Sequence, residues 1–168
     1  MTNKYYAGIG SRKTPDNILR LMTEIAVKLS EDEWILRSGA ADGADTAFHK
    51  GATDADIFLP WKHFNDSDSE LYEVAEEAFE LAKNHHPAWD NLGLGAKSLL
   101  ARNIHQILGR DIGNDSPSRF VICWTPGGKI AGGTGLAIRV AQTYNVPVYN
   151  LAKKEIRDRM WKYVNRDN

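Results

Sequence analysis

The sequence has few features of a secreted, membrane-bound or disulfide-stabilised protein. A single cysteine, Cys123, stands among its 168 residues. No internal disulfide can form, which fits a reducing compartment. No apolar run is long enough to span a bilayer, and residues 1–6 lack the apolar segment of a signal peptide. We therefore expect a soluble cytoplasmic protein without membrane contact.

An excess of charge of either sign is also missing. The chain has 21 Lys and Arg against 22 Asp and Glu, a formal net charge of −1. No overall basic field is present to hold a polyanion, although a local basic patch is compatible with this balance. The adjacent His85 and His86 would face apart on regular structure, and one cysteine gives no zinc-ligand spacing. The sequence predicts neither a metal site nor a cofactor.

Repeats, low-complexity tracts and linkers are absent from the sequence as well. The hydrophobic fraction of 42% and the charged fraction of 26% are ordinary for a globular domain. A chain of this length is enough for one domain with a substantial core, and hardly enough for two. We expect a single domain over residues 1–168.

Short apolar runs alternate with amphipathic segments along the whole chain. Pro15 lies near the first helix start, with Thr14 as its expected N-cap. Helices are expected from there to about residue 30 and at 42–50, 70–83, 95–108, 136–143 and 153–164. Strands are expected at 5–10, 34–36, 56–60, 119–124 and 147–151. This alternation predicts an α/β fold: a doubly wound, mainly parallel, Rossmann-like sheet with helices on both faces.

Three glycine-containing turns follow predicted strands, at residues 8–12, 37–45 and 132–135. The carboxyl ends of parallel strands share one edge of the sheet, so the turns should converge there. A helix N-terminus after such a turn carries partial positive charge and suits phosphate. The alternative for any one of them is a tight strand–helix turn without a ligand.

Polar residues on these turns supply the candidate site. Arg12 has the forked pair of donors that binds phosphate. The alternative for Arg12 is a solvated charge on a loop. Asp42 and Asp45 admit two functional roles, binding a ribose hydroxyl or acting as a catalytic carboxylate, and Asp42 is equally suited to cap its helix. The expected ligand-binding residues are Gly10, Ser11, Arg12, Ser38, Gly39, Ala40, Asp42, Gly43, Asp45, Arg102, Asn103, Gly132, Gly133 and Thr134.

Two further groups could reach the same edge. Arg102 and Asn103 interrupt an apolar helix pattern, although a solvated helix face explains such a pair when it stands alone. Trp61, Trp89 and Trp124 fall near predicted edge loops and could stack a base; packing in the core or an interface is the alternative for each.

In their order and spacing, these motifs resemble the Rossmann-like SLOG superfamily. The superfamily includes the DNA-processing protein A (Smf) family and the LOG, or lysine-decarboxylase-like, proteins. Residues 8–12, 38–45, 102–103 and 132–135 are most similar to the G-S-R, S-G-x-A-x-G-x-D, R-N and small-residue motifs of the DNA-processing branch. The resemblance spans roughly residues 5–151. Small stand-alone chains of this kind also resemble proteins encoded by phages and mobile elements.

Two departures limit what the resemblance implies. LOG-type phosphoribohydrolases carry a glutamate after their glycine motif, and Arg139 stands at that position here. The DNA-processing branch usually has extra domains and a more basic face. We therefore favour a nucleotide-derived small molecule, such as a defence signal, as the partner, bound by a homo-oligomer. Nucleic acid is an open but less favoured partner. The alternatives are a nucleotide N-glycosidase or phosphoribohydrolase using Asp42 or Asp45, and a single-stranded DNA-binding protein.

Overall fold

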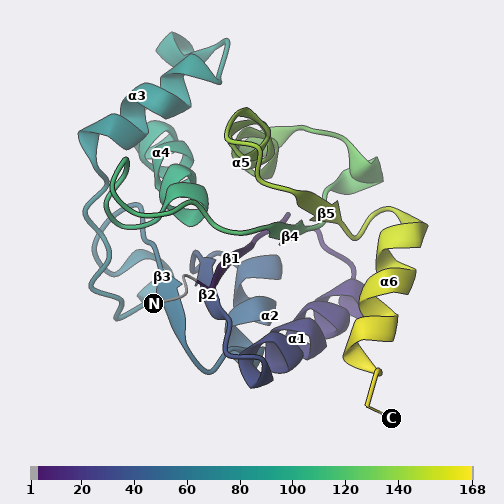
Figure 1. Ribbon diagram of the computed structural model, residues 1–168. Helices are drawn as coiled ribbons and strands as arrows, with labels where there is room; N and C mark the ends of the chain where they lie inside the picture. The colour runs from purple at the N-terminus through teal and green to yellow at the C-terminus, as the bar shows by residue number, and fades with distance from the viewer. Residues whose placement is uncertain (1–3, 168) are drawn as a thin grey trace.

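The computed structural model describes residues 4–167 and shows a parallel sheet between two helical layers (Figure 1). Five strands are described in this part of the chain: β1 (Tyr5–Gly8), β2 (Ile35–Ser38), β3 (Ala55–Ile57), β4 (Val121–Cys123) and β5 (Val148–Asn150). They are ordered β3-β2-β1-β4-β5, and every pair is parallel. The predicted doubly wound α/β fold is confirmed.

Six α-helices connect and cover these strands within residues 4–167: α1 (Asp16–Glu31), α2 (Ala44–Gly51), α3 (Glu76–Asn84), α4 (Leu94–Leu108), α5 (Gly132–Thr143) and α6 (Lys154–Val164). Side chains of α1, α2 and α6 pack on one face of the sheet, around Tyr6, Leu36 and Ile122. Those of α3, α4 and α5 pack on the other face, and Figure 1 shows these two layers on opposite sides.

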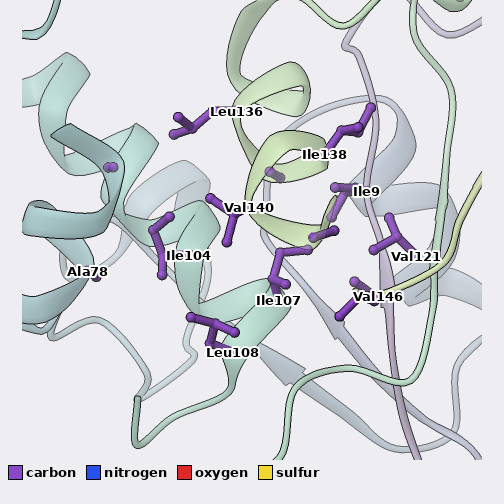
Figure 2. Close-up of a cluster of buried hydrophobic side chains, with 14 of the residues drawn as sticks. Ile9, Ala78, Ile104, Ile107, Leu108, Val121, Leu136, Ile138, Val140 and Val146 are labelled. Atoms are coloured by element: carbon purple, nitrogen blue, oxygen red, sulfur yellow. The ribbon is translucent and has the colours of Figure 1, made fainter. Parts of the chain in front are cut away.

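The second layer contains a continuous apolar core. Figure 2 shows part of it, where Ile104 and Ile107 of α4 lie near Val140 of α5. All three side chains are fully buried, as is Val121 of β4 beneath them. This close packing fixes α4 and α5 relative to each other, so a space between these helices has rigid walls.

The chain reverses its winding direction between β1 and β4. From β1 it winds through α1 to β2 and through α2 to β3, then crosses over by α3 and α4 to β4 on the other side of β1. The loops after β1 and β4 therefore part toward opposite faces. In open parallel sheets, this switch point is where the carboxyl edge opens into a crevice.

Three predicted boundaries are wrong for identifiable reasons. Thr14 does not cap α1: Pro15 is the N-cap residue, and the Thr14 hydroxyl donates to the Ser11 carbonyl at 2.6 Å. The helix predicted at 70–83 begins only at Glu76, because Leu71 pairs with Phe58 at the sheet edge. Helix α5 begins at Gly132, four residues before the predicted start, so the glycine motif forms its first turn.

Two boundaries near the second strand, the end of β2 and the start of α2, also differ from the prediction. Gly43, with φ of 88°, is the N-cap residue of α2, so Asp42 does not cap this helix. Ser38 belongs to β2, whereas Trp34 precedes it.

Within residues 4–167, no helix is both long and apolar enough to cross a membrane. The expected localisation stays a prediction, as do the single-domain organisation and the homo-oligomer.

Candidate functional site

A cleft of about 580 Å³ opens at the switch point, above the carboxyl ends of β1 and β4. The β1–α1 turn and the start of α2 form its floor, α4 forms one wall, and the loops leading into α5 form the other. The residues that line it are Ile9, Gly10, Ser11, Arg12, Lys13, Ala41, Asp45, Ala96, Leu99, Leu100, Arg102, Asn103, Gln106, Thr125, Pro126, Ala131, Gly132, Gly133 and Thr134.

The β1–α1 turn, residues 9–15, presents cations to this cleft. Hydrogen bonds fix its backbone; among them, the Ser11 N–H donates to the Trp124 carbonyl at 3.2 Å, and the Lys13 N–H donates to the Ser11 hydroxyl at 3.0 Å. A Cβ on Gly10 would lie 2.7 Å from the Cβ of Ala44, so the floor closes only around a glycine. Arg12 and Lys13 are exposed and line the cleft.

The β2–α2 turn, residues 38–43, begins in the protein interior and reaches the surface at Asp42. Ser38 is fully buried, and its hydroxyl donates to the Gly8 carbonyl. The exposed Asp42 carboxylate accepts a hydrogen bond from the Asn65 amide at 3.0 Å. Asp45, in the first turn of the helix that follows, lines the cleft. Ser38, Gly39, Ala40, Asp42 and Gly43 do not.

Gly39 makes room for side chains that arrive from elsewhere. A Cβ on Gly39 would lie 2.6 Å from Oδ2 of Asp45, 2.7 Å from Nη1 of Arg102 and 2.9 Å from Nε2 of Gln106. All three side chains are buried. The glycine motif therefore accommodates the polar groups of α4 and α2 rather than an incoming ligand.

The Arg102–Asn103 step of α4 points into the cleft and not to solvent. Arg102 is 4% exposed; its Nη1 donates to the Phe58 carbonyl at 2.9 Å and its Nε to Oδ1 of Asn103 at 2.9 Å. The Asn103 amide in turn donates to the Gly133 carbonyl at 3.2 Å. This chain of hydrogen bonds connects the edge of the sheet to the first turn of α5 across the cleft.

Burial and charge oppose each other at the base of the cleft. Burial raises the pKa of Asp45 above its ordinary value, while the positive charge of Arg102 acts against that rise. Burial likewise lowers the pKa of Arg102, and Asp45 counteracts the shift. With Arg12 and Lys13 above them, three cations face one carboxylate, so the cleft is basic in a chain whose net charge is −1.

The N-terminus of α5 adds a further positive end. Its N-cap residue, Ala131, has no side chain that could bond the first N–H groups, and residues 131–134 line the cleft. The unpaired N–H groups and the dipole of a helix of 12 residues favour an anion at this point. Arg139, at the position of the glutamate of LOG-type enzymes, does not line the cleft.

The sequence prediction missed Lys13 and Gln106. Lys13 follows Arg12 directly, and that doublet was a usable signal. Ala96, Leu99 and Leu100 form an apolar wall of the cleft. Helical spacing alone does not distinguish such a wall from a core stripe.

The tryptophans have different surroundings. Trp89 is 7% exposed and packs in the core. Core packing, the alternative to base stacking, is therefore the role observed for Trp89. Trp124 is partly buried and contacts the β1–α1 turn through its backbone. Trp61 is 44% exposed, on the loop after β3. Within residues 4–167, no cluster of three His, Cys, Asp or Glu side chains has the arrangement of a metal site.

Comparisons with known proteins agree with this architecture. The family model for DNA recombination-mediator protein A matches residues 1–57. A solved structure of DNA processing protein A from Helicobacter pylori, described for its unique single-stranded DNA binding mode, aligns over 98% of this chain and 80% of its own, with a TM-score of 0.61 and 18% identity. No curated protein sequence matches. The expected resemblance to the DNA-processing protein A branch is confirmed.

These findings correct the expected partner. We favoured a nucleotide-derived small molecule over nucleic acid, and that preference is wrong: the family whose model matches residues 1–57 is one of DNA recombination mediators, and the similar structure is that of a protein that binds single-stranded DNA. The balanced overall charge was misleading, because folding gathers Arg12, Lys13 and Arg102 on one cleft. A catalytic role for Asp42 or Asp45 stays an untested prediction.

Proposed function

We propose that this chain binds single-stranded DNA in the cleft between α4 and the N-terminus of α5. The observation that carries the proposal is the convergence of Arg12, Lys13, Arg102 and a helix N-terminus on one cleft of a chain with a net charge of −1. Such a concentration of phosphate-binding groups, drawn from separate elements, suits a polyanion.

Phosphate contacts would come mainly from the β1–α1 turn and the start of α5. Arg12 is exposed on a turn whose backbone is already fixed, so only its side chain has to be ordered when its guanidinium binds a phosphate. The free N–H groups of residues 132–134 face the same space from the other side.

The apolar wall favours a single strand over a duplex. Ala96, Leu99 and Leu100 offer the bases an apolar surface beside the cationic floor. In a duplex, the faces of the bases are stacked on one another and are not available to such a wall. A single strand presents phosphates and base faces together, which is the combination that this cleft accommodates.

The comparisons support the same partner. The matching family is that of a DNA recombination mediator, and the similar Helicobacter pylori structure is described by its single-stranded DNA binding mode. The proposed contact residues are those predicted residues that line the cleft: Gly10, Ser11, Arg12, Asp45, Arg102, Asn103, Gly132, Gly133 and Thr134. To them we add Lys13.

Fluorescence polarisation with a labelled oligothymidylate tests the proposal, with a duplex of equal length as the comparison. We expect the single strand to bind more tightly. The logarithm of its binding constant should fall with the logarithm of salt concentration by roughly 0.7 for each phosphate contact. Absence of single-strand binding at low salt, or equal binding of the duplex, would contradict the proposal.

A further inference from the structure

The loop of residues 61–66, after β3, is fastened against the β2–α2 turn. The Asn65 amide donates to the Ala40 carbonyl at 2.7 Å and to Oδ1 of Asp42 at 3.0 Å. This contact gives Ala40 and Asp42, which do not line the cleft, a structural role. The loop therefore has a fixed position beside the cleft.

The backbone of this loop is held in an unfavourable conformation. His63, Asn65 and Asp66 have φ values of 63°, 50° and 61°, in the left-handed region that favours glycine and that Asn, Asp and His adopt more often than other side chains. Each such residue raises the free energy of the folded state, and the conformation persists only where surrounding contacts impose it. The loop thus holds a defined shape in spite of the strain.

This shape presents one large aromatic ring to solvent. Trp61 is 44% exposed, and its ring contacts that of Phe64 edge to face, with 5.4 Å between centroids. The Phe64 ring lies 5.5 Å from the guanidinium carbon of Arg102, which lines the cleft. Phe64 therefore connects Trp61 to the basic cleft.

The neighbours of Trp61 also suit a nucleic-acid strand. Lys62 is exposed next to it, with its ammonium group 5.8 Å from the ring of Tyr72. An indole face beside a cation binds a base and the phosphate that follows it, because every base has a flat face to stack and every linkage has a charge.

We propose that Trp61 is a base-stacking platform for the single strand where the strand leaves the cleft over the β2–α2 turn. This inference rests on the proposed function and extends the site beyond the cleft. Arg12 and Lys13 hold phosphates on the floor, and Trp61 holds a base at the rim. The platform is indifferent to base identity, because stacking uses the face of the base and not its hydrogen-bonding edge.

The test uses two probes of equal length, an oligothymidylate and its abasic counterpart, with the wild-type chain, Trp61→Ala and Trp61→Phe. Trp161→Ala is the matched control, because Trp161 is 60% exposed on α6 and does not line the cleft. We expect Trp61→Ala to weaken oligothymidylate binding roughly five- to hundredfold and to leave abasic binding unchanged. Trp61→Phe should retain much of the affinity, and Trp161→Ala all of it.

The outcomes separate this inference from the proposed function. If Trp61→Ala binds oligothymidylate as tightly as the wild type, or weakens both probes equally, Trp61 does not stack a base although the cleft binds DNA. If the wild-type chain binds neither probe, the proposed function is wrong and the platform with it. A melting temperature equal to that of the wild type shows that each variant is folded, as expected for a change on an exposed loop.

Discussion

The turns after β1 and β2 have the same place in the fold and differ in what they contact. Both follow buried parallel strands and both contain glycine, yet the first presents Arg12 and Lys13 to the cleft, whereas the second encloses Arg102 and Gln106 around Gly39. A glycine at such a turn shows that other atoms approach the backbone closely. It does not show whether those atoms belong to a ligand or to another part of the protein.

Gly43 is the point at which the two turns meet. A Cβ there would lie 3.0 Å from the Cα of Arg12 and 3.0 Å from the carbonyl oxygen of Ser11, and φ is 88°. Gly43→Ala should lower the free energy of unfolding by roughly 2–4 kcal/mol, from backbone strain and overpacking together. It should also weaken DNA binding by displacing Arg12. Urea unfolding and polarisation titrations measure the two effects.

Gly95→Ala is the control for this substitution. Gly95 lies in α4, and nothing is within 4 Å of a Cβ placed on it. The change should leave stability unaltered or raise it by about 0.5–1 kcal/mol. If Gly43→Ala proves as mild as Gly95→Ala, the two turns are not coupled through this contact.

Gly39→Ala should affect the second turn alone. The added Cβ would displace Asp45, Arg102 and Gln106, which are buried and have little room to move, and the expected loss is roughly 1–3 kcal/mol. Arg12 should keep its place. Loss of stability with residual salt-dependent DNA binding is the expected combination. Unchanged stability would mean that the three side chains are not held as the structure shows.

His105 lies on α4, the helix that carries the Arg102 and Gln106 side chains packed at Gly39 of the β2–α2 turn. It accepts a hydrogen bond from the Ala75 N–H at 3.1 Å through Nε2, and its Nδ1–H donates to the Gly109 carbonyl at 2.8 Å, so the ring is neutral. Burial lowers the pKa of His105. The unfolded chain therefore binds the proton more readily, and stability should fall as pH decreases below about 6.5.

Urea unfolding between about pH 5 and pH 8 measures this effect. His105→Gln should lower stability at neutral pH by roughly 1–3 kcal/mol and should flatten the pH dependence. Exposed His49, on α2, is the matched control, and His49→Gln should leave the pH profile nearly unchanged. If His105→Gln retains the wild-type profile, another group causes the loss of stability in acid.

Asp45→Asn should produce the smallest change, and the quantity that changes is the affinity for DNA. Burial raises the pKa of Asp45, and its carboxylate opposes phosphate in the cleft. Wild-type affinity should therefore rise as pH decreases and Asp45 takes up a proton. The asparagine variant should lack this part of the pH dependence and bind a few times more tightly at neutral pH. Parallel pH profiles for the two proteins would show that Asp45 does not regulate the cleft.

Local patterns predicted most of the fold, because strand and helix periodicity are properties of neighbouring residues. The buried run around Val121 and the helical spacing of α4 are examples. The start of α3 was not predictable in this way, because Leu71 is held by Phe58, a tertiary contact. The contact between the β2–α2 turn and Arg102 was not predictable for the same reason, because Arg102 approaches Gly39 only in the folded chain.

The salt dependence of single-strand binding by Arg12→Ala tests the central claim most directly. Arg159→Ala is the matched control, because Arg159 is exposed on α6 and does not line the cleft. We expect Arg12→Ala to weaken binding about ten- to hundredfold, to reduce the salt slope by roughly 0.7, and to leave the melting temperature unchanged. Arg159→Ala should match the wild type. Equal affinities and equal slopes for the two variants would place the DNA outside this cleft.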